Sequence, residues 1–282
     1  MDNFMQAGGR RIHYVTWGDP SAPPVVLLHG QSGFWHDWSE VAPGLAEQYR
    51  VIAIDHPGFG DSDWDPTGQA YQPGGFAGDL DLIVQQLGLG RFVLVGHSFG
   101  GRIGLVYGCA HADKLRGLVL GDSSPDVDPA GSLEARTYLA SIPATLPTMD
   151  AALKFFRPHY PGMPEAHYRE RLGLYLRQLP TGGFQVKRDP LIGAFYRKIL
   201  AHEIPSPVVD WAPFDAFPAQ VPLLLLRGTR SELLSPTVAA DMHRHNPRLQ
   251  QVDIPDATHL IATEQPAATL QALRAFIEGL SA

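Results

Sequence analysis

The sequence predicts an α/β fold in which a doubly wound, mostly parallel sheet carries an inserted, mainly helical cap. Three observations predict it. Short apolar runs bounded by turn residues alternate with helical stretches toward both ends of the chain, an arrangement typical of α/β domains. Most of these runs are apolar throughout, as expected of strands that helices cover on both faces. The alternation stops between residues 125 and 217, where prolines, aromatic residues and amphipathic segments take its place.

The expected elements follow from these patterns in chain order. Residues 10–19 alternate between polar and apolar side chains, which is typical of an antiparallel edge strand. Continuous apolar runs predict strands at 24–28, 51–54, 92–95, 117–120 and 223–226, with a weaker sixth at 250–254. Helices are predicted between these strands at 78–87 and 98–111, and an amphipathic segment predicts another at 165–179.

The interrupted region is predicted to form a domain of its own. We divide the chain into a core of residues 1–125 and 213–282 and a cap of residues 126–212. Between residues 131 and 212 there are ten Lys or Arg against seven Asp or Glu, whereas the rest holds twelve against twenty-two. We expect this basic segment to cover the carboxyl edge of the sheet, where open α/β sheets assemble their sites. Packing against a face of the sheet is the alternative.

Composition excludes several classes of protein. The net charge of −7 argues against a nucleic-acid binder. No apolar run approaches the roughly 18 residues of a membrane span, and the N-terminal segment lacks the apolar stretch of a signal peptide. Cys109 is the single cysteine, which fits a reducing compartment. A cytoplasmic protein, monomeric or homodimeric, is expected. No zinc-spaced His/Cys cluster or phosphate-binding glycine loop occurs, so no metal or cofactor is expected.

The segment Gly96-His97-Ser98-Phe99-Gly100 carries the first sign of chemistry. It follows a four-residue apolar strand and opens a helix, as a nucleophile elbow does. A strained turn there exposes the serine hydroxyl above the sheet, and unpaired N–H groups at the helix start can hold developing negative charge. Ser98 is therefore the predicted nucleophile. A simple tight turn is the alternative.

A serine nucleophile needs a base, and His259 is the best placed histidine. It lies in a loop directly after the last expected strand, at the carboxyl edge of the sheet. His97 is expected to point sideways into the structure, and His29 and His56 to brace their own loops.

Four ordered motifs together resemble those of an α/β-hydrolase. They are "LLHGQSGFWHDW", "IDHPGFGDSD", "GHSFGG" and "ATHLIATEQP", spread over nearly the whole chain. The resemblance implies that Ser98 attacks, that His259 relays the proton, and that an oxyanion hole stabilises the tetrahedral intermediate. It also implies that the hole uses the backbone N–H groups of Gln31 and Phe99, with Ser32 as an adjacent alternative.

A third catalytic residue, a carboxylate that orients the histidine, is expected in that family, and here this chain departs from the commonest pattern. Where many members carry an aspartate, "LLLLRGTRSELL" has Ser231, followed by Glu232. Another subset of the family uses an aspartate one strand earlier, and "LVLGDSSP" supplies Asp122 at the end of the strand at 117–120. We favour Asp122, because a short carboxylate at a strand end is more rigidly held. Glu232 stays the alternative.

The expected substrate is a small molecule, and an acidic or aromatic one is permitted. The basic excess of the cap allows Arg157 or Arg177 to pair with a carboxylate. Aromatic residues after the first two motifs and in the cap are candidates for the pocket, although core packing is the commoner use of such rings. The candidates are Trp35, Trp38, Trp64, Phe155, Phe156, Phe195 and Tyr196.

These features predict a serine hydrolase that cleaves a carboxylic ester, an amide, a lactone or the C–C bond of a diketone. Haloalkane dehalogenases and epoxide hydrolases resemble this fold but need a carboxylate at the elbow, where this chain has Ser98. Two rival hypotheses are a cofactor-free oxygenase or peroxidase on the same fold, and a binding protein with little turnover.

Overall fold

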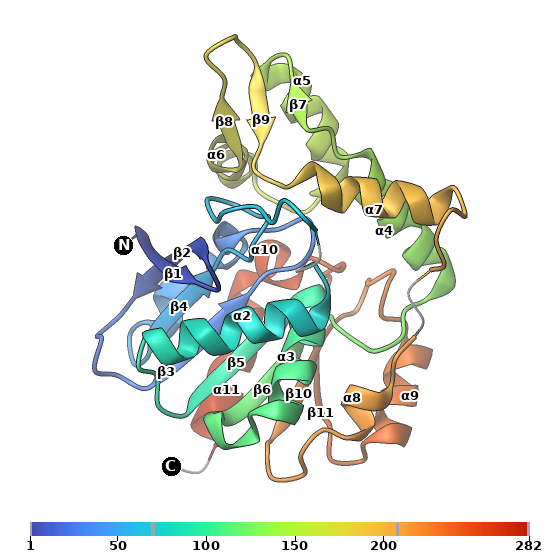
Figure 1. The fold of residues 1–282 in the computed structure, drawn as a ribbon. Helices are drawn as coiled ribbons and strands as arrows, with labels where there is room; N and C mark the ends of the chain where they lie inside the picture. The colour runs from blue at the N-terminus through green and yellow to red at the C-terminus, as the bar shows by residue number, and fades with distance from the viewer. Residues whose placement is uncertain (1, 69–70, 207–208, 281–282) are drawn as a thin grey trace.

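A twisted sheet forms the centre of the computed structural model, which describes residues 2–68, 71–206 and 209–280 (Figure 1). Within those residues the sheet has eight strands in the order β1-β2-β4-β3-β5-β6-β10-β11. β1 and β2 run antiparallel to their neighbours, and the others are parallel. The strands are β1 Asp2–Ala7, β2 Arg10–Trp17, β3 Pro24–Leu28, β4 Arg50–Ile54, β5 Phe92–His97, β6 Leu115–Gly121, β10 Leu223–Gly228 and β11 Gln250–Ile254.

The predicted fold class is confirmed, with one correction at the antiparallel end of the sheet. Residues 10–17 form β2, which pairs with both β1 and β4 and is therefore not the edge strand. The edge strand at this end is β1, which no sequence pattern predicted. β1 alternates between exposed and half-buried side chains, so it lacks the apolar run that marks the inner strands.

Helices cover both faces of the sheet. Alternate side chains of β3 and β4 enter two separate cores, as Val25 and Val26 illustrate. One core includes residues of α2 (Pro73–Gln86), α3 (Phe99–Ala110), α8 (Ala212–Asp215) and α9 (Pro236–His245). The opposite core includes residues of α1 (Ala42–Leu45), α10 (Ile261–Glu264) and α11 (Pro266–Glu278). Among the described residues, no helix has the length and apolar character required to cross a membrane.

The cap stands over one edge of the sheet (Figure 1). Backbone hydrogen bonds join it to the loop after β4, where Gly60 donates to the carbonyl of Lys187 at 2.8 Å, so this is the carboxyl edge. The elements of the cap are α4 Pro129–Ser141, β7 Thr145–Leu146, α5 Met149–Phe156, η3 Arg157–His159, α6 Glu165–Tyr175, β8 Leu176–Gln178, β9 Phe184–Val186 and α7 Pro190–Leu200.

The cap differs from the sequence prediction in one respect. The helix expected at 165–179 ends at Tyr175, and the chain continues as β8, which pairs with β9 in a small antiparallel sheet. These strands have two or three residues each and few apolar side chains, so no periodicity marks them. The cap elements α4 to α7 lie between residues 126 and 212, and the domain boundaries themselves remain a prediction.

The turn between β5 and α3 is packed too closely for side chains at its glycines. A Cβ atom at Gly100 would lie 2.7 Å from the carbonyl oxygen of Leu28 and 2.9 Å from that of His29. At Gly96 it would lie 2.3 Å from the backbone of Gly100. Glycine at these two positions therefore lets α3 start directly against β3 and β5.

We predict that Gly100→Ala lowers the free energy of unfolding by about 2 kcal/mol or more, because backbone atoms must move to admit the methyl group. Gly78→Ala is the matched control, since Gly78 lies inside α2 with no atom within 4 Å of the added Cβ. It should raise stability by about 0.5–1 kcal/mol. Urea unfolding of the three proteins measures both effects, and equal stability of the two variants would contradict the packing argument.

Candidate active site

Ser98 occupies a strained turn between β5 and α3. Its φ of 54° and ψ of −118° lie outside the regions that non-glycine residues favour. Hydrogen bonds hold this conformation: Ser98 N–H donates to the carbonyl of Gly121 at 2.8 Å, and the hydroxyl of Ser123 donates to the carbonyl of Ser98 at 2.6 Å. The turn thus places Ser98 at the carboxyl end of β5 and at the N-terminus of α3.

Asp122 directly follows β6 and has a fully buried carboxylate. Its Oδ1 accepts a hydrogen bond from the backbone N–H of Gly228 at 2.9 Å. Its Oδ2 accepts one from the hydroxyl of Ser231 and one from Nδ1 of His259, both at 2.6 Å. The three donors come from the end of β10, the loop after it and the loop after β11. Together they give both carboxylate oxygens a partner and fix the orientation of the carboxylate.

His259 is fixed from two sides. Its Nδ1–H donates to Asp122, which leaves the lone pair on Nε2. Its backbone carbonyl accepts a hydrogen bond of 2.7 Å from Nε2 of His97, the residue beside Ser98. Burial, followed by the nearby His259, lowers the pKa of His97 to about 3. His97 is therefore a neutral imidazole that positions the His259 loop against the elbow.

Glu232, the alternative acid, is exposed. In the described part of the chain its carboxylate has no ion pair within 4.0 Å, and its backbone packs against Gly131 at the start of α4. The preceding Ser231 instead turns inward and donates to Asp122.

The two predicted oxyanion donors lie on either side of the serine. Phe99 is the first residue of α3, and the first four N–H groups of a helix have no partner within it. Gln31 belongs to the loop of residues 30–34 that follows β3. This loop 30–34 reaches the elbow closely, because a Cβ atom on Gly30 would lie 3.1 Å from Cβ of Ser98.

Three side chains of the cap hold loop 30–34. Nε of Arg188 donates to the carbonyl of Gln31 at 3.1 Å, and the hydroxyl of Tyr196 donates to the side-chain oxygen of Gln31. Nη2 of Arg171 donates to the carbonyl of Ser32 at 3.3 Å. The position of Gln31 therefore depends on the cap as well as on β3.

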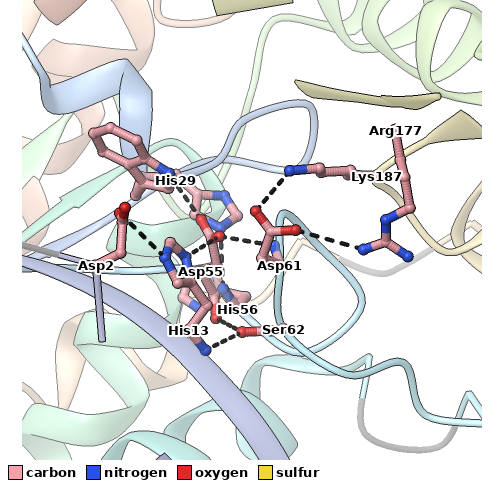
Figure 2. Close-up of polar contacts among 10 residues, drawn as sticks. Asp2, His13, His29, Asp55, His56, Asp61, Ser62, Arg177 and Lys187 are labelled. Atoms are coloured by element: carbon pink, nitrogen blue, oxygen red, sulfur yellow. Dashed lines mark hydrogen bonds and ion pairs between the residues drawn. The ribbon is translucent and has the colours of Figure 1, made fainter. Parts of the chain in front are cut away.

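A second buried carboxylate, Asp55, accepts hydrogen bonds from the segment that directly follows loop 30–34 and from two other segments (Figure 2). Its Oδ2 accepts from Nδ1 of His13 at 2.7 Å and from the backbone N–H of Asp61 at 3.0 Å, while Oδ1 accepts from the N–H of Trp35 at 2.7 Å. In Figure 2 Lys187 extends from the cap toward Asp61, with Nζ 2.6 Å from Oδ2. The "IDHPGFGDSD" motif thus links β2, the start of η1 (Trp35–Trp38) and the cap.

Comparison with known proteins agrees with this architecture. The sequence profile of the alpha/beta hydrolase fold matches residues 23–266. The chain belongs to the alpha/beta hydrolase fold family. The 3-hydroxybutyrate-oligomer hydrolase of Cupriavidus necator is 28% identical to it over 273 residues, which span 93% of this chain and 91% of the relative. The 2-(acetamidomethylene)succinate hydrolase of Mesorhizobium japonicum is 27% identical over 264 residues, with 92% and 89% covered.

A solved structure shows the same fold over the whole chain. The crystal structure of E-2-(acetamidomethylene)succinate hydrolase superposes with a TM-score of 0.85 at 24% identity and covers 99% of each chain. The protein is an enzyme, a hydrolase of this family.

The aromatic residues named from the sequence have different places in the hydrolase. Trp38 lies in the core beneath the sheet and Phe156 in the core of the cap, each 1% exposed. Other candidate rings are partly buried and pack on a neighbouring ring: Trp35 packs on Trp17, Phe155 on Phe156, and Phe195 on Tyr196. Trp64 is half-buried. Of these aromatic side chains Tyr196 is the one that hydrogen-bonds to Gln31.

The two cap arginines named from the sequence face other groups. The Arg157 guanidinium donates to the carbonyl of Met163 at 3.0 Å, and that of Arg177 lies 3.4 Å from Asp61. Arg188, which sequence reasoning missed, is 3% exposed and binds carbonyl oxygens with Nε and Nη1. Its Nη2 is buried without a hydrogen-bond partner in the described residues, and no carboxylate there lies within 4.0 Å of it. The contact between Arg188 and Gln31 can be seen only in the folded structure, because the two residues are 157 positions apart in the sequence.

Four histidines of the hydrolase core are buried in the neutral state. Burial lowers the pKa of His36 and His97 to about 3, that of His56 to about 4, and that of His29 well below its usual value. The hydrogen bonds of His29 fit a neutral ring protonated on Nδ1. Nδ1 donates to the carbonyl of Gly30, and Nε2 accepts from the N–H of His56 at 3.1 Å. Such imidazoles resist protonation while the chain is folded.

We predict that the free energy of unfolding falls by at least about 2 kcal/mol between pH 7 and pH 5. Below pH 6.5 the unfolded chain protonates these histidines and the folded chain does not, so stability is present above that pH and is lost as the pH falls. His13 acts in the opposite sense, because its bond to Asp55 outweighs burial and raises its pKa, but it is one group against four. Urea unfolding across this range tests the prediction, with His56→Gln expected to flatten the slope. A level profile would contradict it.

Proposed function

We propose that the protein is a serine hydrolase that cleaves a small carbonyl substrate with Ser98, His259 and Asp122. The observation that carries the proposal is the 2.6 Å hydrogen bond between Asp122 and Nδ1 of His259, beside a serine in the strained conformation of a nucleophile elbow. Asp122 would hold the imidazole in one tautomer and stabilise it when it becomes charged. No comparable contact supports Glu232 in this role.

The reaction follows from that arrangement. Nε2 of His259 removes the proton of the Ser98 hydroxyl as the oxygen attacks the carbonyl carbon. The resulting oxyanion accepts hydrogen bonds from the N–H groups of Gln31 and Phe99. When the intermediate collapses, His259 returns the proton to the leaving group, and water then releases the acyl group from Ser98 by the same steps in reverse order. Esters, amides, lactones and diketone C–C bonds all fit this chemistry.

The family relationship favours hydrolysis over the two rival hypotheses. The relatives named above are hydrolases, and a pure binding protein has no need of a strained elbow beside a histidine and a carboxylate. The serine at position 98 also argues against epoxide and haloalkane substrates, since an alkyl-ester intermediate requires a carboxylate there.

We further propose that the substrate carries a carboxylate and that Arg188 binds it. Three basic side chains at the junction between cap and core already have acidic partners: Arg171 pairs with Asp37, and both Lys187 and Arg177 pair with Asp61. Burial lowers the pKa of Arg188, but its guanidinium still stays protonated, because arginine is not deprotonated in proteins. A buried cation without a counter-ion is costly, and a bound carboxylate would supply one.

The position of Arg188 fits that role. Its guanidinium is anchored on the carbonyl of Gln31, the residue whose backbone N–H is the expected oxyanion donor, and its Nη2 has no partner in the described residues. The two relatives provide independent support, because the succinate and the hydroxybutyrate oligomer in their names both bear carboxylates.

Fluorophosphonate labelling tests the catalytic residues without knowledge of the natural substrate. The wild-type protein should be labelled and Ser98→Ala should not. Asp122→Asn should slow labelling by several orders of magnitude, about 10⁴-fold, because the imidazole loses its correct tautomer. Glu232→Gln should react at the wild-type rate. Loss of labelling in Glu232→Gln with retention in Asp122→Asn would reverse the assignment, and circular dichroism verifies that each variant is folded.

Matched esters test the carboxylate site. The wild-type protein should hydrolyse mono-4-nitrophenyl adipate with a higher kcat/KM than its methyl ester. Arg188→Gln should reduce that preference by about 10- to 100-fold, the worth of a charge-assisted hydrogen bond. Arg177→Gln, which removes a half-exposed guanidinium paired with Asp61, should keep it.

Two results would contradict the role of Arg188. A wild-type protein indifferent to the charge of the ester would have no carboxylate site. Equal losses on both esters in Arg188→Gln would mean that Arg188 only positions Gln31.

A further inference from the structure

His36, His167 and Glu170 converge at a second junction between core and cap. His36 lies in η1, and α6 presents His167 and Glu170 on one face, because they are three residues apart. One donor atom from each residue lies within 4.8 Å of the other two. Nε2 of His36 is 3.8 Å from Oε1 of Glu170, and the two imidazole rings stack with their centroids 4.8 Å apart.

The histidines have unused nitrogens in this cluster. His36 is 1% exposed, and neither of its ring nitrogens has a hydrogen-bond partner in the described chain; the same is true of Nε2 of His167. Buried polar atoms are almost always paired in folded proteins, so an unpaired ring nitrogen on each of two neighbouring histidines points to a ligand. An imidazole gives one ring nitrogen to a metal ion, so each histidine can supply one donor atom.

A carboxylate behind His167 completes the pattern. Oε1 of Glu40 lies 3.4 Å from Nδ1 of His167. A metal-binding histidine usually donates its second ring nitrogen to a carboxylate, which fixes the tautomer and directs the other nitrogen toward the ion. Glu40 would do this for His167 and leave Nε2 as the donor atom.

We propose that His36, His167 and Glu170 bind a zinc ion that joins the cap to the core beside loop 30–34. Two imidazoles and one carboxylate form a familiar ligand set for zinc, with the fourth tetrahedral position open to water. Ligand atoms at about 2.0–2.2 Å from the ion stand closer together than these atoms do, so binding requires small rotations of the exposed Glu170 and of His167. The site is independent of Ser98, His259 and Asp122.

The ion would act on the enzyme through the cap. His36 is adjacent to Asp37, whose carboxylate accepts from Nε of Arg171 at 2.8 Å, so a second bond between η1 and α6 already exists there. Zinc would add a stronger link one residue away. Its expected effect is to hold α6 against the segment that follows loop 30–34, and hence to resist separation of the cap from the core.

Titration of EDTA-treated protein with zinc chloride tests the proposal. Calorimetry should show one zinc ion bound per chain, and Tm should rise by about 5 °C at a free zinc concentration one hundred times Kd. His167→Gln/Glu170→Gln should lose this binding and the Tm shift. Each Tm shift is measured against the zinc-free form of the same variant, so any change of basal stability on replacing the largely buried His167 does not enter the comparison.

The matched control is His202→Asn/Glu203→Gln, which removes an exposed histidine and glutamate from outside the cluster and should bind zinc as the wild-type protein does. Absence of stoichiometric binding to the wild-type protein would overturn the proposal. So would undiminished one-to-one binding by His167→Gln/Glu170→Gln, because the ion would then be held elsewhere.

Discussion

The buried carboxylate of Asp122 is the constraint on which the geometry of the site depends. Its three hydrogen-bond donors come from separate segments, the end of β10, the loop after β10 and the loop after β11. They converge because β6, β10 and β11 are neighbours in the sheet. Removing one donor would leave a buried charge short of a partner, which costs more than the bond itself contributes. The order of the strands, the inward turn of Ser231 and the orientation of His259 therefore all serve to give this one carboxylate its hydrogen bonds.

The strained backbone of Ser98 also depends on the segment around Asp122. Ser98 keeps its strained backbone because Gly121, the last residue of β6, accepts from its N–H and Ser123, just after Asp122, donates to its carbonyl. The same short segment after β6 therefore fixes both the proposed nucleophile and the proposed acid. The oxyanion side is different, because loop 30–34 is held by Arg188 and Tyr196 of the cap. A movement of the cap would disturb Gln31 while leaving Asp122 and Ser98 in place.

Sequence reasoning succeeded where the signal is local. The strands at 24–28 and 250–254 match β3 and β11 to the residue, because turn residues bound short runs at both positions. The position of Asp122 at the carboxyl edge could be anticipated, since it directly follows a buried strand, while its role as the acid stays a prediction. β1 and the small sheet of the cap were missed, because their strands are short or exposed and are held by pairing with other strands. Arg188 could not be found, since its neighbours come from distant segments and the basic excess of the cap does not say which cation is unpaired.

That basic excess has a physical explanation in the contacts between cap and core. The core is acidic, and Asp37 and Asp61 each receive cations from the cap, Arg171 for the first and Lys187 with Arg177 for the second. Part of the charge difference between the two parts of the chain therefore serves to seat the cap on the carboxyl edge. Since these cations are neutralised, the number of arginines in the cap says little about specificity. Arg188 is the more specific indication of a carboxylate substrate, because its buried Nη2 has neither a carboxylate nor a hydrogen-bond acceptor among the described residues.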